Sequence, residues 1–300
     1  MPSGGDAGRA VGETRGMSLL IGAHELASEL DSGRRVRLLD VRWRLNAPEG
    51  RPAYLAGHLP GAVYVDLERE LSRPGHPEVG RYPVPRLEDL EQSARRWGLD
   101  DGDQVVVYDD NDAVAAARAW WLLRRRGVAV RVLDGGIRSW VAAGFQVERG
   151  DVLPRPGDIT LLDVDAGVAT IDDAARAPSE GYLVDVRAPE HYRGLSAGQD
   201  AAAGHIPGAL NIPTVAHIAR DGTLRPPDEI RSTIIGAAVD PEAPIVLYCS
   251  TGIASAHSAL AFALAGVDAR IFIGSWSQWS LASSRPVAVG RTPTGVLQGW

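Results

Sequence analysis

Residues 244–255 read PIVLYCSTGIAS and pass from an apolar run into a small polar loop. The apolar run 244–248 predicts a short buried strand, and the alanine-rich stretch 256–265 predicts a helix. Cys249, the only cysteine among 300 residues, therefore stands between the end of a strand and the start of a helix. Loop N–H groups and the positive end of a helix dipole both favour a thiolate there. Cys249 is thus a candidate nucleophile, with a buried packing role as the alternative.

The chain contains an internal duplication. Four patterns occur twice in the same order, offset by about 140 residues, which indicates a repeated domain and not a short solenoid repeat. The pairs are LLDVR at 38–42 and LVDVR at 183–187, GHLPGA at 57–62 and GHIPGA at 204–209, VVVY at 105–108 and IVLY at 245–248, and LDGGIRSW at 133–140 and FIGSWSQW at 272–279.

Each repeat alternates apolar strands with amphipathic segments. Helices are predicted at 86–97 and 228–237, before the central strands, and at 113–126, after the first of them. This alternation is typical of an α/β fold in which helices flank a parallel sheet. We expect a disordered leader at 1–16, a first domain at 17–148, a linker at 149–160, a second domain at 161–290 and a loose tail at 291–300. Met17 is an alternative start.

Composition narrows the function. An apolar content of 45% with 23% charged residues is ordinary for a globular protein, and no apolar stretch approaches a membrane span. The net charge of −7 gives no reason to expect nucleic-acid binding. All 31 basic residues are arginine, which excludes lysine-based catalysis. The lone thiol suits a reducing compartment, and we expect a cytoplasmic protein without a membrane partner.

The duplication offers an internal control on Cys249. The first repeat places Asp109 where the second places the cysteine, so only one repeat carries a sulfur nucleophile. A cysteine kept only for packing has less reason to differ in this way, which favours a functional role. His58 and His205 open the two turn motifs, where an imidazole more often anchors backbone than takes part in catalysis.

These motifs together resemble the two-domain rhodaneses, which include thiosulfate and 3-mercaptopyruvate sulfurtransferases. The resemblance spans 19–289 and implies a degenerate first domain and a catalytic second domain. It implies that Cys249 takes sulfur from a small-molecule donor as a persulfide and passes it to cyanide or a thiol acceptor, or to a sulfur-accepting protein. No metal or organic cofactor is implied. The implied substrate-binding residues are the loop residues Ser250, Thr251, Gly252, Ile253, Ala254 and Ser255, together with Asp185, His191, Arg193 and Trp276.

The chain departs from the family pattern at two places. The loop lacks the charged residues of the thiosulfate enzymes and is nearer the uncharged loop of the mercaptopyruvate enzymes. His191 stands where the family places a substrate-binding arginine, and a second such arginine aligns near Asp200. Histidine is a weaker and less bidentate ligand for a carboxylate than arginine. Arg193 therefore swings in, or the donor differs, or activity on standard donors is poor.

Three other functions compete. A duplicated fold retained only for interaction is one of them, and the presence of Cys249 and Gly252 argues against it. A Cys-loop phosphatase requires an arginine six residues after the cysteine, where this chain has Ser255. A persulfide carrier or sensor with little turnover of its own fits the missing arginines better. It would accept sulfur from a protein partner more readily than from thiosulfate.

Overall fold

The computed structural model describes residues 18–164 and 167–298, and these form two compact units. Unit 1 comprises 18–71, 85–164 and 221–223, and unit 2 comprises 72–84, 167–220 and 224–298. Neither unit is one continuous stretch of chain, because two short segments are exchanged between the two halves of the sequence. Residues 72–84 belong to unit 2 although they lie in the first repeat, and 221–223 belong to unit 1. The expected leader at 1–16 lies outside the described residues.

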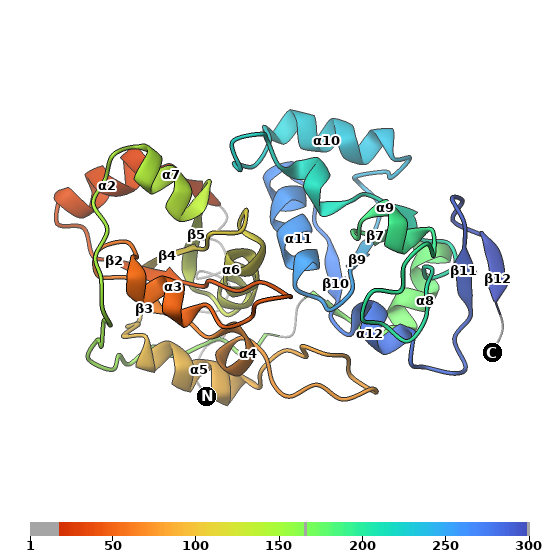
Figure 1. Ribbon diagram of the computed structural model, residues 1–300, viewed down its shortest axis with the longest axis horizontal. Coiled ribbons are helices and arrows are strands. Elements are labelled where there is room, and N and C mark those ends of the chain that lie inside the picture. Colours follow the sequence, from red (N-terminus) through yellow and green to blue (C-terminus); the bar gives the residue numbers. More distant parts are fainter. Residues whose placement is uncertain (1–17, 165–166, 299–300) are drawn as a thin grey trace, which may run out of the picture. The chain divides into compact units, whose positions relative to one another are not determined.

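Unit 1 is built on a five-stranded parallel sheet (Figure 1). The order is β1-β5-β4-β2-β3, with β4 (Gln104–Tyr108) between β5 (Ala129–Leu133) and β2 (Val36–Asp40). The short strands β1 (Leu20–Ile21) and β3 (Val63–Tyr64) complete the edges. Residues 105–108 of the central strand β4 are apolar and buried, as expected for a strand whose two faces are covered by helices.

Unit 2 repeats this topology strand for strand. Its order is β6-β10-β9-β7-β8, and every pairing within it is parallel. β9 (Ile245–Tyr248) is central, between β10 (Arg270–Phe272) and β7 (Tyr182–Asp185), and all four of its residues are buried. β6 (Val168–Ala169) and β8 (Leu210–Asn211) form the edges. The α/β prediction with two tandem domains is confirmed.

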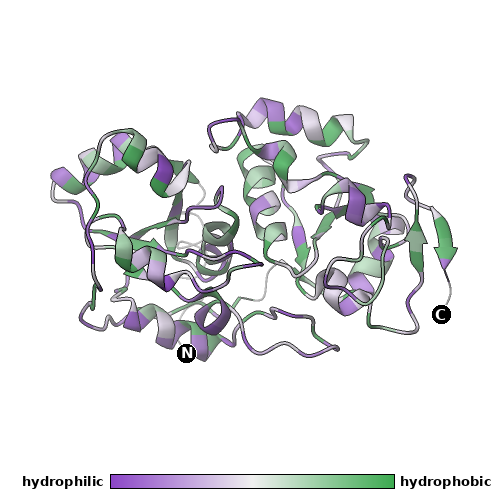
Figure 2. Ribbon diagram, viewed as in Figure 1, coloured by the Kyte–Doolittle hydropathy of each residue, from purple (hydrophilic) through white to green (hydrophobic). Residues whose placement is uncertain are grey.

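The four predicted helices all form, with ends that differ by at most two residues. They are α5 (Leu87–Arg96), α6 (Val114–Arg125), α10 (Pro227–Gly236) and α11 (Ala254–Leu264). Polar and apolar residues are interspersed along α5 and α10 (Figure 2). Most residues of α6 and α11 are buried. The other helices of unit 1 are α2 (Ala23–Asp31), α3 (Arg51–Ala56), α4 (Leu67–Glu70) and α7 (Gly136–Ala142). Those of unit 2 are α8 (Ile171–Glu180), α9 (Pro189–Tyr192), the 3-10 turn η1 (Thr214–His217) and α12 (Ser275–Trp279). No helix within the described ranges is long and apolar enough to cross a bilayer.

The predicted tail at 291–300 contains a short strand at Val296–Gln298. These residues form β12, which pairs antiparallel with β11 (Val287–Val289). β11 is in turn held to the body of unit 2, because the backbone of His205 exchanges two hydrogen bonds with Ala288 at 2.9 and 3.0 Å. The predicted linker is also ordered, since Gly157 N donates to Arg95 O at 2.8 Å.

Candidate active site

Cys249 lies directly after β9 and before α11, as the sequence predicts. Its side chain is buried, with 3% of the residue exposed. The backbone N–H groups of Thr251 and Gly252 point at the sulfur, with N–Sγ distances of 3.4 and 3.0 Å. Such N–H groups stabilise negative charge on the sulfur, which is the form that acts as a nucleophile. The loop therefore presents Cys249 as a sulfur nucleophile whose negative charge two backbone N–H groups stabilise.

The loop keeps this shape because α12 is bonded beneath it. Trp276 N donates to Cys249 O at 2.9 Å, and Ser277 N donates to Ser250 O at 2.9 Å. Gly252 adopts a φ of +82°, and a Cβ at this position would lie 2.4 Å from Ile273 O. Only glycine satisfies both the left-handed backbone and this close approach. The second copy of the Gly-Ser-Trp motif thus supports the cysteine loop directly.

The rest of the loop is enclosed within unit 2. Thr251, Ile253 and Ser255 are buried, and Ala254 begins α11. The Ser255 hydroxyl has no hydrogen-bond partner among the described residues. A buried hydroxyl without a partner costs free energy, so it is available to a group that enters the loop.

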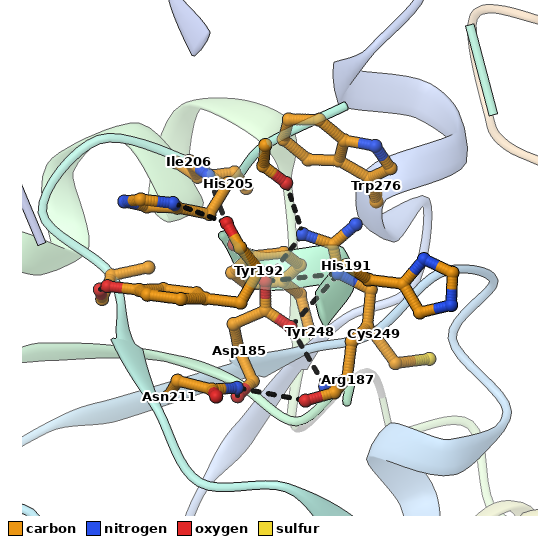
Figure 3. A network of polar contacts seen from close by, with 12 residues as sticks. Asp185, Arg187, His191, Tyr192, His205, Ile206, Asn211, Tyr248, Cys249 and Trp276 are labelled. Atoms are coloured by element: carbon orange, nitrogen blue, oxygen red, sulfur yellow. Dashed lines mark hydrogen bonds and ion pairs between the residues drawn. The ribbon is translucent and has the colours of Figure 1, made fainter. Parts of the chain in front are cut away.

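Asp185 and Arg187 form a buried ion pair close to the cysteine loop (Figure 3). Arg187 Nη2 lies 2.6 Å from Asp185 Oδ2 and also donates to Gly204 O at 2.6 Å. The guanidinium stacks over Trp276, with its carbon 4.6 Å from the ring centroid. Burial by itself lowers the pKa of Arg187, but the adjacent carboxylate of Asp185 outweighs it and holds the pKa above its ordinary value. The guanidinium of Arg187 is therefore engaged with the side chain of Asp185.

His205 anchors backbone, which agrees with its turn motif. Its Nδ1 lies 2.8 Å from Tyr192 O and its Nε2 lies 3.1 Å from Pro293 O. The ring stacks on Tyr192 with 3.9 Å between centroids. In unit 1, His58 repeats the arrangement by stacking on Tyr54 at 4.2 Å. These contacts give both histidines a structural role in the turn.

His191 and Arg193 occupy different settings in and after α9. His191 Nδ1 lies 3.1 Å from Ser196 O, so the ring is held by the loop that follows. In the view of Figure 3, His191 and Cys249 both lie to the right of the Asp185–Arg187 pair. The guanidinium of Arg193 makes no hydrogen bond or ion pair with the residues that the structure describes. A role of either side chain in donor binding stays a prediction.

The structure adds one residue that sequence reasoning missed. Arg81 pairs with Asp200, the residue that aligns near the second family arginine. The two are separated by 119 positions, and no periodicity or motif connects them. Trp276, by contrast, is wholly buried in the core of unit 2 and donates its indole N–H to Ala202 O at 3.0 Å.

Comparison with known proteins agrees with this geometry. The model of the rhodanese-like domain matches residues 22–143 and again 170–282. This chain belongs to the rhodanese-like family. The chain is 44% identical over 276 residues to a Mycobacterium tuberculosis protein named "Putative thiosulfate sulfurtransferase SseB", covering 91% of this chain and 97% of that protein. It is 30% identical over 276 residues to the 3-mercaptopyruvate sulfurtransferase of Escherichia coli K12, covering 89% and 96% respectively.

A solved structure with the same fold covers most of the chain. The crystal structure of the 3-mercaptopyruvate sulfotransferase SseA from Escherichia coli matches with a TM-score of 0.77 and 29% identity. The match covers 87% of this chain and 99% of that one. The resemblance deduced from the repeated motifs is confirmed, because both repeats match the rhodanese-like domain.

Proposed function

We propose that this rhodanese-like protein is a sulfurtransferase that moves sulfane sulfur through a persulfide on Cys249. The observation that carries the proposal is the buried sulfur of Cys249 at the end of β9, faced by two loop N–H groups at 3.0 and 3.4 Å. The names of the relatives support the same activity. We further propose a cytoplasmic location, which the single thiol supports, and small-molecule donors and thiol acceptors as substrates.

The first half-reaction loads the enzyme. The Cys249 thiolate attacks the outer sulfur of the donor, and the new S–S bond forms as the donor's own bond to that sulfur breaks. With thiosulfate the S–S electron pair leaves on sulfite. With 3-mercaptopyruvate the C–S pair leaves on the enolate of pyruvate, which takes a proton from solvent. The loop N–H groups that face the sulfur then stabilise the charge of the persulfide.

The second half-reaction unloads it. A cyanide ion or an acceptor thiolate attacks the outer sulfur, and the electron pair of the S–S bond returns to Cys249. The products are thiocyanate or an acceptor persulfide, and the thiolate is regenerated without an external oxidant or reductant. Division of the transfer into two displacements lets one loop stabilise both. The buried Ser255 hydroxyl, which has no hydrogen-bond partner among the described residues, is our candidate for a hydrogen bond to the added sulfur.

The second candidate is a persulfide carrier with little turnover on small donors. The specific observation in its favour is the pairing of Arg187 with Asp185 and of Arg81 with Asp200. Two cations next to two carboxylates attract an anionic donor less than free arginines do. A carrier of this kind would receive its sulfur from a protein partner.

Intact-mass spectrometry separates these candidates. The purified protein is exposed to thiosulfate or 3-mercaptopyruvate, with Cys249→Ser as the matched control. One added sulfur that cyanide removes, and that the control lacks, is the expected result. Absence of added sulfur with both donors would reject the proposal that the protein takes sulfur from small-molecule donors, and would favour the persulfide carrier. Slow addition with no steady-state thiocyanate would also favour the carrier.

A further inference from the structure

Residues 72–84 form a segment that packs with unit 2 while lying in the first half of the sequence. Two hydrogen bonds hold it on α12, and a close backbone approach brings it against Gly274, which precedes that helix. Arg81 N donates to Ser277 Oγ at 3.1 Å, and Gln278 Nε2 donates to Glu78 O at 2.5 Å. Gly80 adopts a φ of +87°, and a Cβ there would lie 2.6 Å from Gly274 O. This segment is therefore fitted closely to the helix that supports the cysteine loop.

Ser277 connects the segment to the loop in two hydrogen bonds. Its hydroxyl accepts from Arg81 N, and its own N–H donates to Ser250 O at 2.9 Å. Ser250 follows Cys249 directly. Ser277 thus links the backbone of Arg81 to Ser250. This link fixes the position from which the Arg81 side chain extends.

The guanidinium of Arg81 is only partly engaged. Nη2 pairs with Asp200, and Nη1 donates to Gln199 Oε1 at 3.0 Å. The side chain of Arg81 keeps an exposed fraction of 28%, whereas that of Asp200 is 5% exposed. A guanidinium carries five N–H donors, so Arg81 retains donors for an incoming anion without leaving Asp200.

Other cations near the loop are less suited to this role. Arg187 directs its guanidinium to Asp185 and Gly204 O and is 4% exposed, so an anion would have to break a buried ion pair to reach it. His191 is held on Ser196 O. Asp200 is near all of them: burial raises its pKa, and the positive charges of Arg81, Arg187 and His191 oppose that rise. Of the two guanidinium groups that act on Asp200, that of Arg81 is the accessible one.

We propose that Arg81 binds the anionic group of the sulfur donor and that Asp200, by neutralising part of its charge, makes the site prefer a monoanion over a dianion. This proposal rests on the sulfurtransferase function above and names a specificity-determining residue for it. The two ion pairs bring two positive and two negative charges together, so the cluster has little net attraction for thiosulfate. A single carboxylate, as in 3-mercaptopyruvate, needs fewer compensating charges.

Alkylation of Cys249 tests the proposal independently of sulfur transfer. Iodoacetate carries a carboxylate and iodoacetamide is neutral, and the single cysteine makes the reaction stoichiometric. We expect Arg81→Gln to lower the iodoacetate rate about tenfold, as the loss of one charge-assisted hydrogen bond implies, and to leave the iodoacetamide rate nearly unchanged. Arg73→Gln, an exposed arginine in the same segment, is the matched control and should change neither rate.

Donor kinetics then test the specificity. Arg81→Gln should raise KM for both donors with a smaller effect on kcat, and Arg81→Lys should restore part of the loss. Asp200→Asn should raise kcat/KM for thiosulfate more than for 3-mercaptopyruvate, because it leaves Arg81 uncompensated. Equal alkylation ratios in Arg81→Gln and wild type would overturn the proposal, as would an unchanged donor preference in Asp200→Asn. Absence of a persulfide in the wild-type protein, with a normal alkylation result, would instead reject the proposed function alone.

Discussion

The loops after β4 and after β9 have the same place in their sheets and opposite chemistry. Asp109 follows β4 and is fully buried, and its carboxylate accepts four backbone N–H groups. Asn111 and Ala113 donate to Oδ1 at 2.8 and 2.9 Å, while Ala115 and Ala116 donate to Oδ2 at 2.8 and 3.0 Å. The sulfur of Cys249, its counterpart, accepts from the N–H groups of Thr251 and Gly252.

This difference shows how the same loop conformation can hold either a structural carboxylate or a reactive sulfur. In unit 1 the anion is a permanent part of the chain, so the N–H groups of the loop are already occupied. In unit 2 the side chain of Cys249 is shorter than that of Asp109. The N–H groups at the helical end of its loop can therefore bond a second atom, such as the outer sulfur of a persulfide. Burial raises the pKa of Asp109, and the four N–H donors oppose that rise.

The backbone conformations of the two loops also differ. Unit 1 places Asp112 and Ala113 at φ values of 55° and 64°, a region that non-glycine residues enter at a cost. Unit 2 uses Gly252 for its left-handed position, and Ile253 has a φ of −82°. The Asp109 carboxylate offsets the strain in unit 1 by bonding the N–H groups on both sides of it. The catalytic loop instead uses a glycine, which adopts the left-handed backbone without strain and leaves room for Ile273 O.

The largest expected effect comes from copying unit 1 into unit 2. Cys249→Asp should reduce sulfur transfer by more than about a thousandfold, because it removes the nucleophile. If the loop after β9 offers the same backbone N–H groups as the loop after β4, the new carboxylate will accept hydrogen bonds from them. The free energy of unfolding will then change little. Thermal and urea unfolding against Cys249→Ser measure this. Marked destabilisation relative to that control would show that the loops are not equivalent.

Removal of the carboxylate from unit 1 should be the next largest effect. Asp109→Ala leaves four buried N–H groups without an acceptor and should lower the free energy of unfolding by about 3–5 kcal/mol. Asp109→Asn, which keeps one oxygen, should lose less. Urea unfolding measures both variants. A loss below about 1 kcal/mol for Asp109→Ala would contradict the structural role that we assign to this side chain.

A smaller effect concerns the buried pair Asp40–Arg42, the unit 1 counterpart of Asp185–Arg187. Burial raises the pKa of Asp40 to about 6 from an ordinary 3.8, against the opposing charge of Arg42. The folded state then holds this proton more tightly than the unfolded chain. Its contribution to stability is complete below about pH 4 and is lost as the pH rises through about 6.

The test is the difference in unfolding free energy between the wild-type protein and Asp40→Asn across pH 4–7. That difference should fall by up to about 3 kcal/mol as the pH rises, as the shift in pKa implies. Urea unfolding at several pH values isolates it, because the other titrating groups are common to both proteins. A difference that grows with pH would mean that Arg42 lowers the pKa of Asp40 in the folded state.

Much of the fold and the centre of the site follow from sequence alone. The repeated motifs predict two α/β domains because strand and helix periodicity is local and the motifs recur in order. Cys249 stands out because it is the single cysteine and because Asp109 replaces it in the other repeat. The helix boundaries are within two residues for the same reason, since propensity and pattern act over one or two turns.

Tertiary structure alone decided how distant segments meet. Nothing in the pattern of residues 72–84 indicates that they pack on α12, or that Arg81 pairs with Asp200 across 119 positions. β12 was missed because three exposed residues carry no strand signal until β11 supplies a partner. Long-range pairing depends on which backbone and charged groups the folded chain brings together. Local periodicity does not encode such long-range pairings. The cysteine is therefore evident in the sequence, while the charged residues around it are not.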